Sequence, residues 1–184
     1  MGQWGDAWSA AAACVGWNAG THSACALGPE TREGLDRPPL LSGSIAKGDA
    51  FLSAQAMGAD LAYIGSAFIA TDEANADERY KQSIVDSSAS DIIYSNLFTG
   101  VHGNYLRKSI EDAGLDPENL PESDPSAMNF GSGGNTDAKA WKDIWGSGQD
   151  VGSSKKVQSA GGYVAVVTAA CYQATEAAAG GGCG

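Results

Sequence analysis

The chain has 184 residues, 43% of them hydrophobic, and a formal net charge of −11 at pH 7. This length suffices for one domain with a sizeable core. The acidic balance argues against a nucleic-acid partner, which needs a basic face, and against docking on an anionic membrane.

The four cysteines show neither CxxC spacing nor the spacing of a metal site, so we expect free thiols in a reducing compartment and no bound metal. The N-terminal apolar run, residues 10–15, is too short for a signal core or a membrane span. A cytoplasmic protein is therefore expected.

Residues 10–15 are small and apolar and fit either a strand or a buried helical turn. A glycine-flanked loop follows at residues 16–21. A short helix is expected over residues 30–35, and Arg37-Pro38-Pro39 would stop it, because proline forces its predecessor into extended geometry.

The next segment repeats one pattern twice. Residues 39–45 predict an apolar strand that runs into Gly43-Ser44, and a helix follows with Asp49 as its N-cap and Gly58 at its end. Residues 61–64 predict a second strand, which ends in Gly65-Ser66, and residues 71–73 give a helix-start signal. Strand–GlySer–helix repetition predicts a parallel α/β sheet, and fully apolar strands favour one covered on both faces.

The remaining chain predicts helices and one long excursion. A helix is expected over residues 75–89, and residues 91–135 are rich in Asn, Gly, Ser and Pro, with one helix over 106–113 that ends at Gly114. Residues 137–145 predict a helix that carries Trp141 and Trp145, and residues 161–179 predict a final alanine-rich helix.

Two Gly-Ser turns from adjacent strands present free backbone N–H groups toward one point, which predicts an anion site. The alternative is two ordinary tight turns. His22 and His102 are the only histidines, and each is either a general base or a hydrogen-bonded structural residue. No nucleophile elbow, P-loop or dinucleotide fingerprint occurs in the sequence.

Several stretches resemble the nitronate monooxygenases, also called 2-nitropropane dioxygenases. The resemblance is strong over residues 39–152 and is carried by segments 40–46, 59–71, 73–76, 94–107 and 141–149. Runs such as Tyr94 to Arg107 contain rare residue types, which makes the similarity specific.

The resemblance implies an α/β fold, the C-terminal portion of a (βα)8 TIM barrel with strands 6–8, helices and a loop-rich excursion. It implies non-covalent FMN and oxidation of alkyl nitronates by O2 to a carbonyl compound and nitrite. Residues 42–44 would follow strand 7 and residues 65–66 strand 8. The implied FMN-binding residues are Gly20, Ser42, Gly43, Ser44, Gly65, Ser66, Gly148 and Gln149.

The sequence departs from the family at the catalytic loop. Gly16-Trp17-Asn18-Ala19-Gly20-Thr21 aligns with a loop in which the family carries histidine at the position of Asn18. Asparagine can hydrogen-bond a nitronate oxygen but cannot take a proton, so His22 is the alternative base.

Length is the second departure, since a whole barrel takes about 250 residues. We expect one partial barrel domain over 1–184, comprising an FMN-phosphate unit (39–90), an active-site excursion with the Trp helix (91–152) and a C-terminal helix with a Gly-rich tail (153–184). The partners expected are a nitronate, O2 and either a missing N-terminal half, which would carry strands 1–5, or further copies of this chain in a homo-oligomer. The alternative functions are an inactive flavin-binding remnant and an FMN-dependent NADH:quinone or enoyl reductase.

Overall fold

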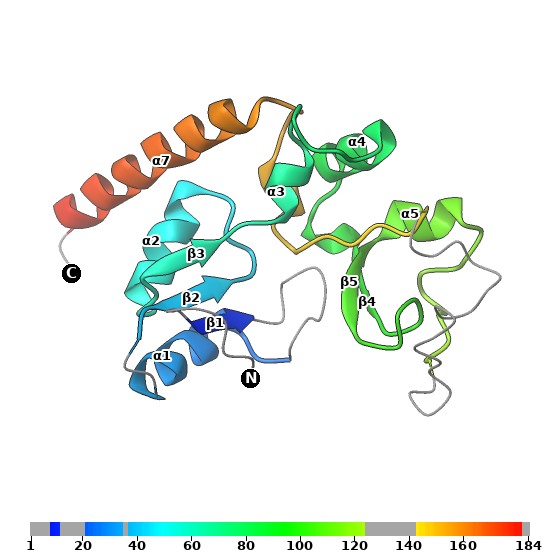
Figure 1. Cartoon of the computed structure of the whole chain (residues 1–184), viewed down its shortest axis with the longest axis horizontal. Helices are drawn as coiled ribbons and strands as arrows, with labels where there is room; N and C mark the ends of the chain where they lie inside the picture. Colours follow the sequence, from blue (N-terminus) through cyan, green and yellow to red (C-terminus); the bar gives the residue numbers. More distant parts are fainter. Residues whose placement is uncertain (1–7, 12–20, 35–36, 124–142, 182–184) are drawn as a thin grey trace.

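A computed structural model describes residues 8–11, 21–34, 37–123 and 143–181 of the chain. Figure 1 shows a parallel sheet with helices α1, α2 and α7 on one side of the picture, and a β-hairpin with helices α4 and α5 on the other. The short helix α3 lies between these two groups, at the point where the chain leaves the sheet.

The sheet has three strands in the order β1-β2-β3: β1 (Trp8–Ala11), β2 (Pro39–Ser42) and β3 (Leu61–Tyr63). Both pairings are parallel, and Ser42 stands opposite Tyr63 at the carboxyl ends of β2 and β3. The expected parallel α/β arrangement is therefore present, and it places the turns after β2 and β3 at the same edge of the sheet.

Helices cover one face of this sheet. Helix α1 (Ala24–Gly34) leads from β1 to β2, and α2 (Gly48–Ala56) leads from β2 to β3. Leu41 forms a buried cluster with residues of α2 and the turns beside it, and residues of α1 pack against that cluster. Because side chains alternate along a strand, the other face carries Leu61 and Tyr63.

That other face is open at β3. Leu61 is 50% and Tyr63 is 60% exposed. The expectation of a sheet covered on both faces is thus wrong for β3 within the described residues. The strands are apolar enough for two covered faces, but α1 and α2 pack on only one of them.

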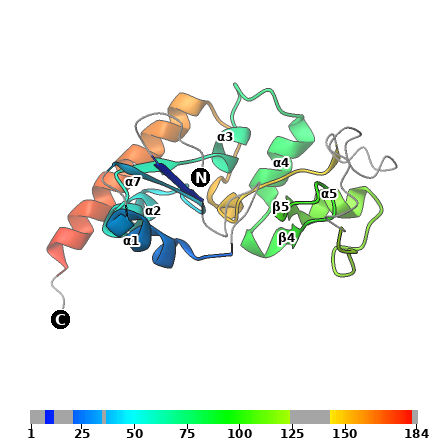
Figure 2. The same cartoon turned by 60° about the horizontal axis from the view of Figure 1, so that its bottom comes forward.

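Helix α7 (Ala160–Gly180) packs on the outer side of α2, as Figures 1 and 2 show. The two helices meet at Gly48, where an added Cβ would lie 2.2 Å from the backbone of Ala170 and Cys171. Glycine at this position is what permits so close an approach.

The second group of elements consists of short helices around an antiparallel hairpin. Its elements are α3 (Ser66–Ile69), α4 (Glu78–Asp86), η1 (Ala89–Asp91), β4 (Ile92–Ser95), β5 (Gly103–Leu106), α5 (Arg107–Asp112) and η3 (Val151–Ser153). Ile84, Leu106 and Val151, each at most 1% exposed, are central to its core.

Several helix boundaries differ from the expectations. Helix α1 begins at Ala24, well before the expected start, and continues through Pro29. Lys47, not Asp49, occupies the N-cap position of α2. The Asp49 carboxylate accepts a hydrogen bond from the backbone N–H of Ala50, in the first turn of the helix. Gly58 does end α2, with φ +90°.

The signal at residues 71–73 does not start a helix. Thr71 forms a parallel bridge with Gln158 instead, and α4 starts only after Asp77, which caps it. The hairpin β4–β5 was not expected in the excursion. Trp145 lies beyond the end of any helix, in an extended segment whose neighbour Gly146 bridges Tyr105; Trp141 lies outside the described residues.

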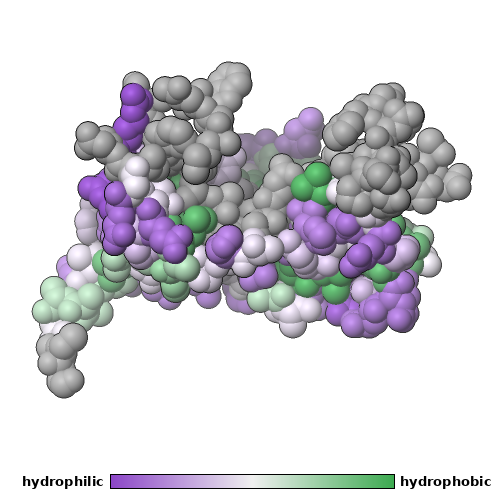
Figure 3. Space-filling model, turned by 90° about the horizontal axis from the view of Figure 1, so that it is seen from below, coloured by the Kyte–Doolittle hydropathy of each residue, from purple (hydrophilic) through white to green (hydrophobic). Residues whose placement is uncertain are grey.

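The described helices include none long and apolar enough to span a bilayer. Seen from below in Figure 3, hydrophilic side chains (purple) occupy much of the described surface, with hydrophobic ones (green) between them.

Candidate functional site

The two Gly-Ser turns lie side by side at the carboxyl edge of the sheet, because β2 and β3 are parallel neighbours. In the first turn Gly43 has φ 122° and Ser44 has φ 53°, so two consecutive residues adopt left-handed geometry. In the second turn Gly65 precedes α3, which starts at Ser66. Left-handed turns of this kind direct backbone N–H groups into a concavity that suits an anion.

Tyr163, near the start of α7, joins the two turns. Its hydroxyl donates to the carbonyl oxygen of Ala46 at 3.0 Å, and its ring packs edge-to-face on Phe68, with centroids 5.1 Å apart. Ala46 and Ala67, which follow the two turns, are buried in one cluster with Tyr163. A single buried side chain thus holds both turns in a fixed relation.

A third segment, residues 146–150, reaches the second turn. The backbone N–H of Gly148 donates to the Ser66 hydroxyl oxygen at 2.8 Å, and this contact is buried. The Tyr80 hydroxyl donates to the Gly146 carbonyl oxygen and fixes the start of the segment. The three segments that were predicted to bind the cofactor are therefore brought together.

An acid lies at this junction. Burial raises the pKa of Asp150 above the usual value of a carboxyl group. Burial also raises the pKa of Tyr163 to about 12, with a further contribution from the charge of Asp150. The ionisation of Asp150 and that of Tyr163 are therefore linked electrostatically.

The sequence prediction missed Asp150 and Tyr163. Asp150 directly follows the predicted Gly148-Gln149 pair, so its place in the sequence could have identified it as a neighbour of the site. Tyr163 lies in the first turn of an alanine-rich helix, where a lone aromatic side chain is a mark of packing, but the sequence does not identify its partner.

Two predicted residues, Asn18 and Gly20, lie outside the described residues. His22 is exposed and stands in the β1–α1 connection, two residues before α1. The carboxyl end of β1, from which the chain leads to His22, lies at the same edge of the sheet as that of β2, because the two strands are parallel. His102 is exposed in the β4–β5 hairpin, where it stacks on Tyr94 with ring centroids 4.8 Å apart.

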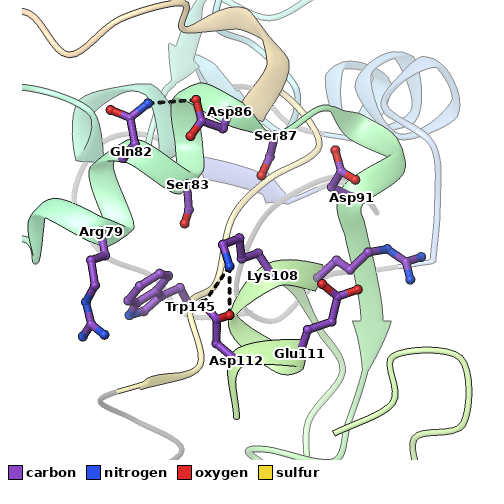
Figure 4. A pocket seen from close by; sticks show the side chains of 11 residues that line it. Arg79, Gln82, Ser83, Asp86, Ser87, Asp91, Lys108, Glu111, Asp112 and Trp145 are labelled. Carbon is purple, nitrogen blue, oxygen red and sulfur yellow. Dashed lines mark hydrogen bonds and ion pairs between the residues drawn. The ribbon is translucent and has the colours of Figure 1, made fainter. Parts of the chain in front are cut away.

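A pocket of about 540 Å³ lies elsewhere, between α4 and α5, and Figure 4 shows its lining. Several of its charged side chains have partners: Lys108 pairs with Asp112 at 2.8 Å, and the Asp86 carboxylate accepts from the Gln82 amide at 2.8 Å. It shares no residue with the three converging segments. Its lining has three cations (Arg79, Arg107 and Lys108) and four carboxylates (Asp86, Asp91, Glu111 and Asp112), which makes it a poorer anion site than the sheet edge.

Metal binding finds no support among the described side chains, where no three His, Cys, Asp or Glu residues gather in a suitable group. Cys25 and Cys171 are free thiols.

Comparison with known proteins places these features in context. No family model matches the chain. The nitronate monooxygenase of Paraburkholderia phytofirmans is 30% identical over 104 residues, which are 56% of this chain and 28% of that protein. A Mycobacterium tuberculosis protein named as a monooxygenase is 30% identical over 158 residues, 79% of this chain and 42% of that protein.

Solved structures show the same relation. Nitroalkane oxidase from Streptomyces ansochromogenes superposes with a TM-score of 0.73 at 26% identity, over 94% of this chain and 53% of that chain. FabK from Thermotoga maritima superposes with a TM-score of 0.74 at 21% identity, over 95% of this chain and 57% of that chain, which is a likeness of fold. The chain thus spans little more than half of these structures and less than half of the two curated relatives.

Proposed function

Since the chain is a relative of the nitronate monooxygenases, we propose that it forms the phosphate-binding side of an FMN site in an enzyme that oxidises alkyl nitronates with O2. The observation that carries this proposal is the convergence of residues 42–44, 65–66 and 148–149 at the carboxyl edge of a parallel sheet. In (βα)8 barrels, the loops after the last two strands commonly form a phosphate site at this edge.

The residues present fit a phosphate group. The consecutive left-handed residues Gly43 and Ser44 form the kind of turn whose backbone N–H groups suit an anion, and Ser44 adds an exposed hydroxyl. Lys47, exposed at the N-cap of α2, adds a positive charge three residues later. Helix α2 has nine residues, and its N-terminus contributes further unpaired N–H groups.

Bound FMN would supply the oxidising group that accepts electrons from the nitronate and passes them to O2. The described residues would hold its phosphate, and Tyr163 and Ser66 would keep the turns in place through their contacts with Ala46 and Gly148. Among the described residues between β1 and α1, His22 carries the titratable side chain. It would face the same edge of the sheet.

The phosphate site is tested by changing Ser44. Ser44→Asp places a negative charge at the turn, while Ser44→Asn is a neutral control of nearly the same shape, and both residue types tolerate left-handed geometry. We expect Ser44→Asp to weaken FMN binding by roughly tenfold or more, as quenching of flavin fluorescence measures it, and Ser44→Asn to have little effect. Equal affinity of both variants for FMN would contradict the phosphate site.

The reaction is tested separately on the wild-type chain. Nitrite release from an alkyl nitronate in the presence of FMN, above the background of free flavin, is the expected result. Flavin binding without nitrite release would leave a flavin-binding remnant as the function. NADH-dependent loss of quinone absorbance would instead indicate a reductase.

A further inference from the structure

The pocket between α4 and α5 has no part in the proposed FMN site, but it has the size of a ligand site. Its volume of about 540 Å³ lies within the range of small-molecule sites, about 300–1,000 Å³. Trp145, which is 8% exposed, gives it an apolar wall. The polar side chains around this wall decide which kind of molecule would fit.

The three cations of the lining are already neutralised. Each pairs with an acid at 2.7–3.2 Å: Arg79 with Asp77, Arg107 with Glu118, and Lys108 with Asp112. Two of these acids, Asp77 and Glu118, are not part of the lining. The pocket therefore offers a ligand little positive charge that is not already paired.

Three carboxylates of the lining keep their negative charge. Asp86 accepts from the neutral amide of Gln82 at 2.8 Å, and Asp91 accepts from the backbone N–H and the hydroxyl of Ser88 at 2.8 Å. Glu111 forms no ion pair with the part of the chain that the structure describes. Such a surplus of one sign in a recess attracts a ligand of the opposite charge.

Ser83 gives a second, independent indication of a ligand. It is 7% exposed, and its hydroxyl has no hydrogen bond to any described residue. Ser53 in α2 and Ser109 in α5, by contrast, donate to a backbone carbonyl oxygen nearby. Figure 4 shows the Ser83 hydroxyl directed into the space between α4 and α5. Because a buried hydroxyl is costly without a partner, a ligand in the pocket would stabilise it.

We propose that this pocket binds an organic cation, namely an aliphatic polyamine. Its ammonium groups would donate to the three carboxylates and to the Ser83 hydroxyl oxygen, and its methylene chain would pack on Trp145. A metal ion fits less well, because no three acidic, His or Cys side chains among the described residues gather at one point. The pocket shares no residue with the segments of the proposed FMN site, so the two proposals stand or fall separately.

Spermidine, an aliphatic chain with three ammonium groups, is the probe, and isothermal titration calorimetry of the whole chain at low ionic strength measures its binding. We expect saturation at one molecule per chain. Glu111→Gln removes one charge, keeps the shape and should weaken binding roughly threefold or more. Ser83→Ala should weaken it roughly fivefold or more, because hydrogen bonds to charged groups are strong. Glu33→Gln, a change of an exposed acid in α1, is the matched control and should bind as wild type does.

Magnesium chloride is the second probe, since a chain of net charge −11 attracts cations without any specific site. Its binding should not depend on Ser83 or Glu111. The inference is overturned if spermidine shows no saturable binding, if Glu33→Gln weakens binding as much as Glu111→Gln, or if magnesium shows the same dependence on both residues. Urea midpoints check that the variants are folded; if Ser83→Ala is not, the comparison of Glu111→Gln with Glu33→Gln decides alone.

Discussion

The contact between α2 and α7 predicts an unusual sensitivity to one methyl group. Gly48→Ala would place a Cβ 2.2 Å from the Ala170 carbonyl carbon and the Cys171 nitrogen, and 2.6 Å from the Ala170 Cβ. Because carbon atoms pack at about 3.5–4.0 Å, the two helices would have to separate by roughly 1 Å or more. Backbone lines the contact, so no side-chain rotation can relieve it.

We expect Gly48→Ala to lower the free energy of unfolding by about 1–3 kcal/mol, the usual range for overpacking. The higher helix propensity of alanine, worth up to about 1 kcal/mol, would offset only part of this loss. The urea midpoint, followed by circular dichroism, measures the change. Since α2 begins directly after the first turn, the same shift should also weaken FMN binding.

Gly161→Ala is the matched control in the first turn of α7, where an added Cβ meets nothing within 4 Å. Alanine there should leave stability unchanged or raise it by up to about 1 kcal/mol. If Gly48→Ala is as stable as Gly161→Ala, then the two helices do not approach each other as described, and the reasoning is refuted.

Three further substitutions follow from the packing and the charges. Ile84→Ala, at a position that is 0% exposed, should lower the free energy of unfolding by about 2–5 kcal/mol in urea denaturation, and a loss below about 1 kcal/mol would argue against this core. Tyr163→Phe removes the donor to Ala46 and should cost about 0.5–1.5 kcal/mol near neutral pH. Burial raises the pKa of Tyr163 to about 12, so its phenol ionises in the unfolded chain first and wild-type stability should fall as pH rises from about 10 to about 12. Thermal unfolding across this pH range should show a smaller loss for Tyr163→Phe, and identical profiles would contradict the assignment. Arg32→Ala breaks an ion pair with Asp60 at 2.8 Å, but both side chains are about half exposed. The free energy of unfolding, measured by urea denaturation, should therefore fall by less than about 1 kcal/mol.

Local rules predicted the part of the fold in which sequence-adjacent elements pack together. Apolar runs predict the strands at 39–42 and 61–63, and a glycine at the end of a helical pattern predicts the end of α2 at Gly58. The hairpin β4–β5 escaped prediction because its strands are only four residues long and its register partners lie 8 to 14 residues apart in the chain. Its buried Asn104 interrupts the apolar pattern that would reveal a strand.

The candidate site was predictable in its turns but not in its connections. Gly-Ser pairs at the ends of two strands are visible in the sequence, and parallel pairing brings them together. The contact of Gly148 with Ser66 joins residues 82 positions apart, and that of Tyr163 with Ala46 joins residues 117 positions apart. Such contacts depend on how α7 and the excursion return to the sheet, which no local pattern specifies.

The conformational energy of the Ser44 backbone is a cost of folding and not of ligand binding. A non-glycine residue with φ 53° is held in a conformation that costs an L-residue roughly 1–2 kcal/mol, and the neighbouring turn and α2 impose that conformation before any ligand arrives. The chain meets this cost on folding, so an arriving phosphate does not have to order the turn. Preorganisation of this kind raises affinity without any added contact, because the loss of loop entropy is removed from the binding step.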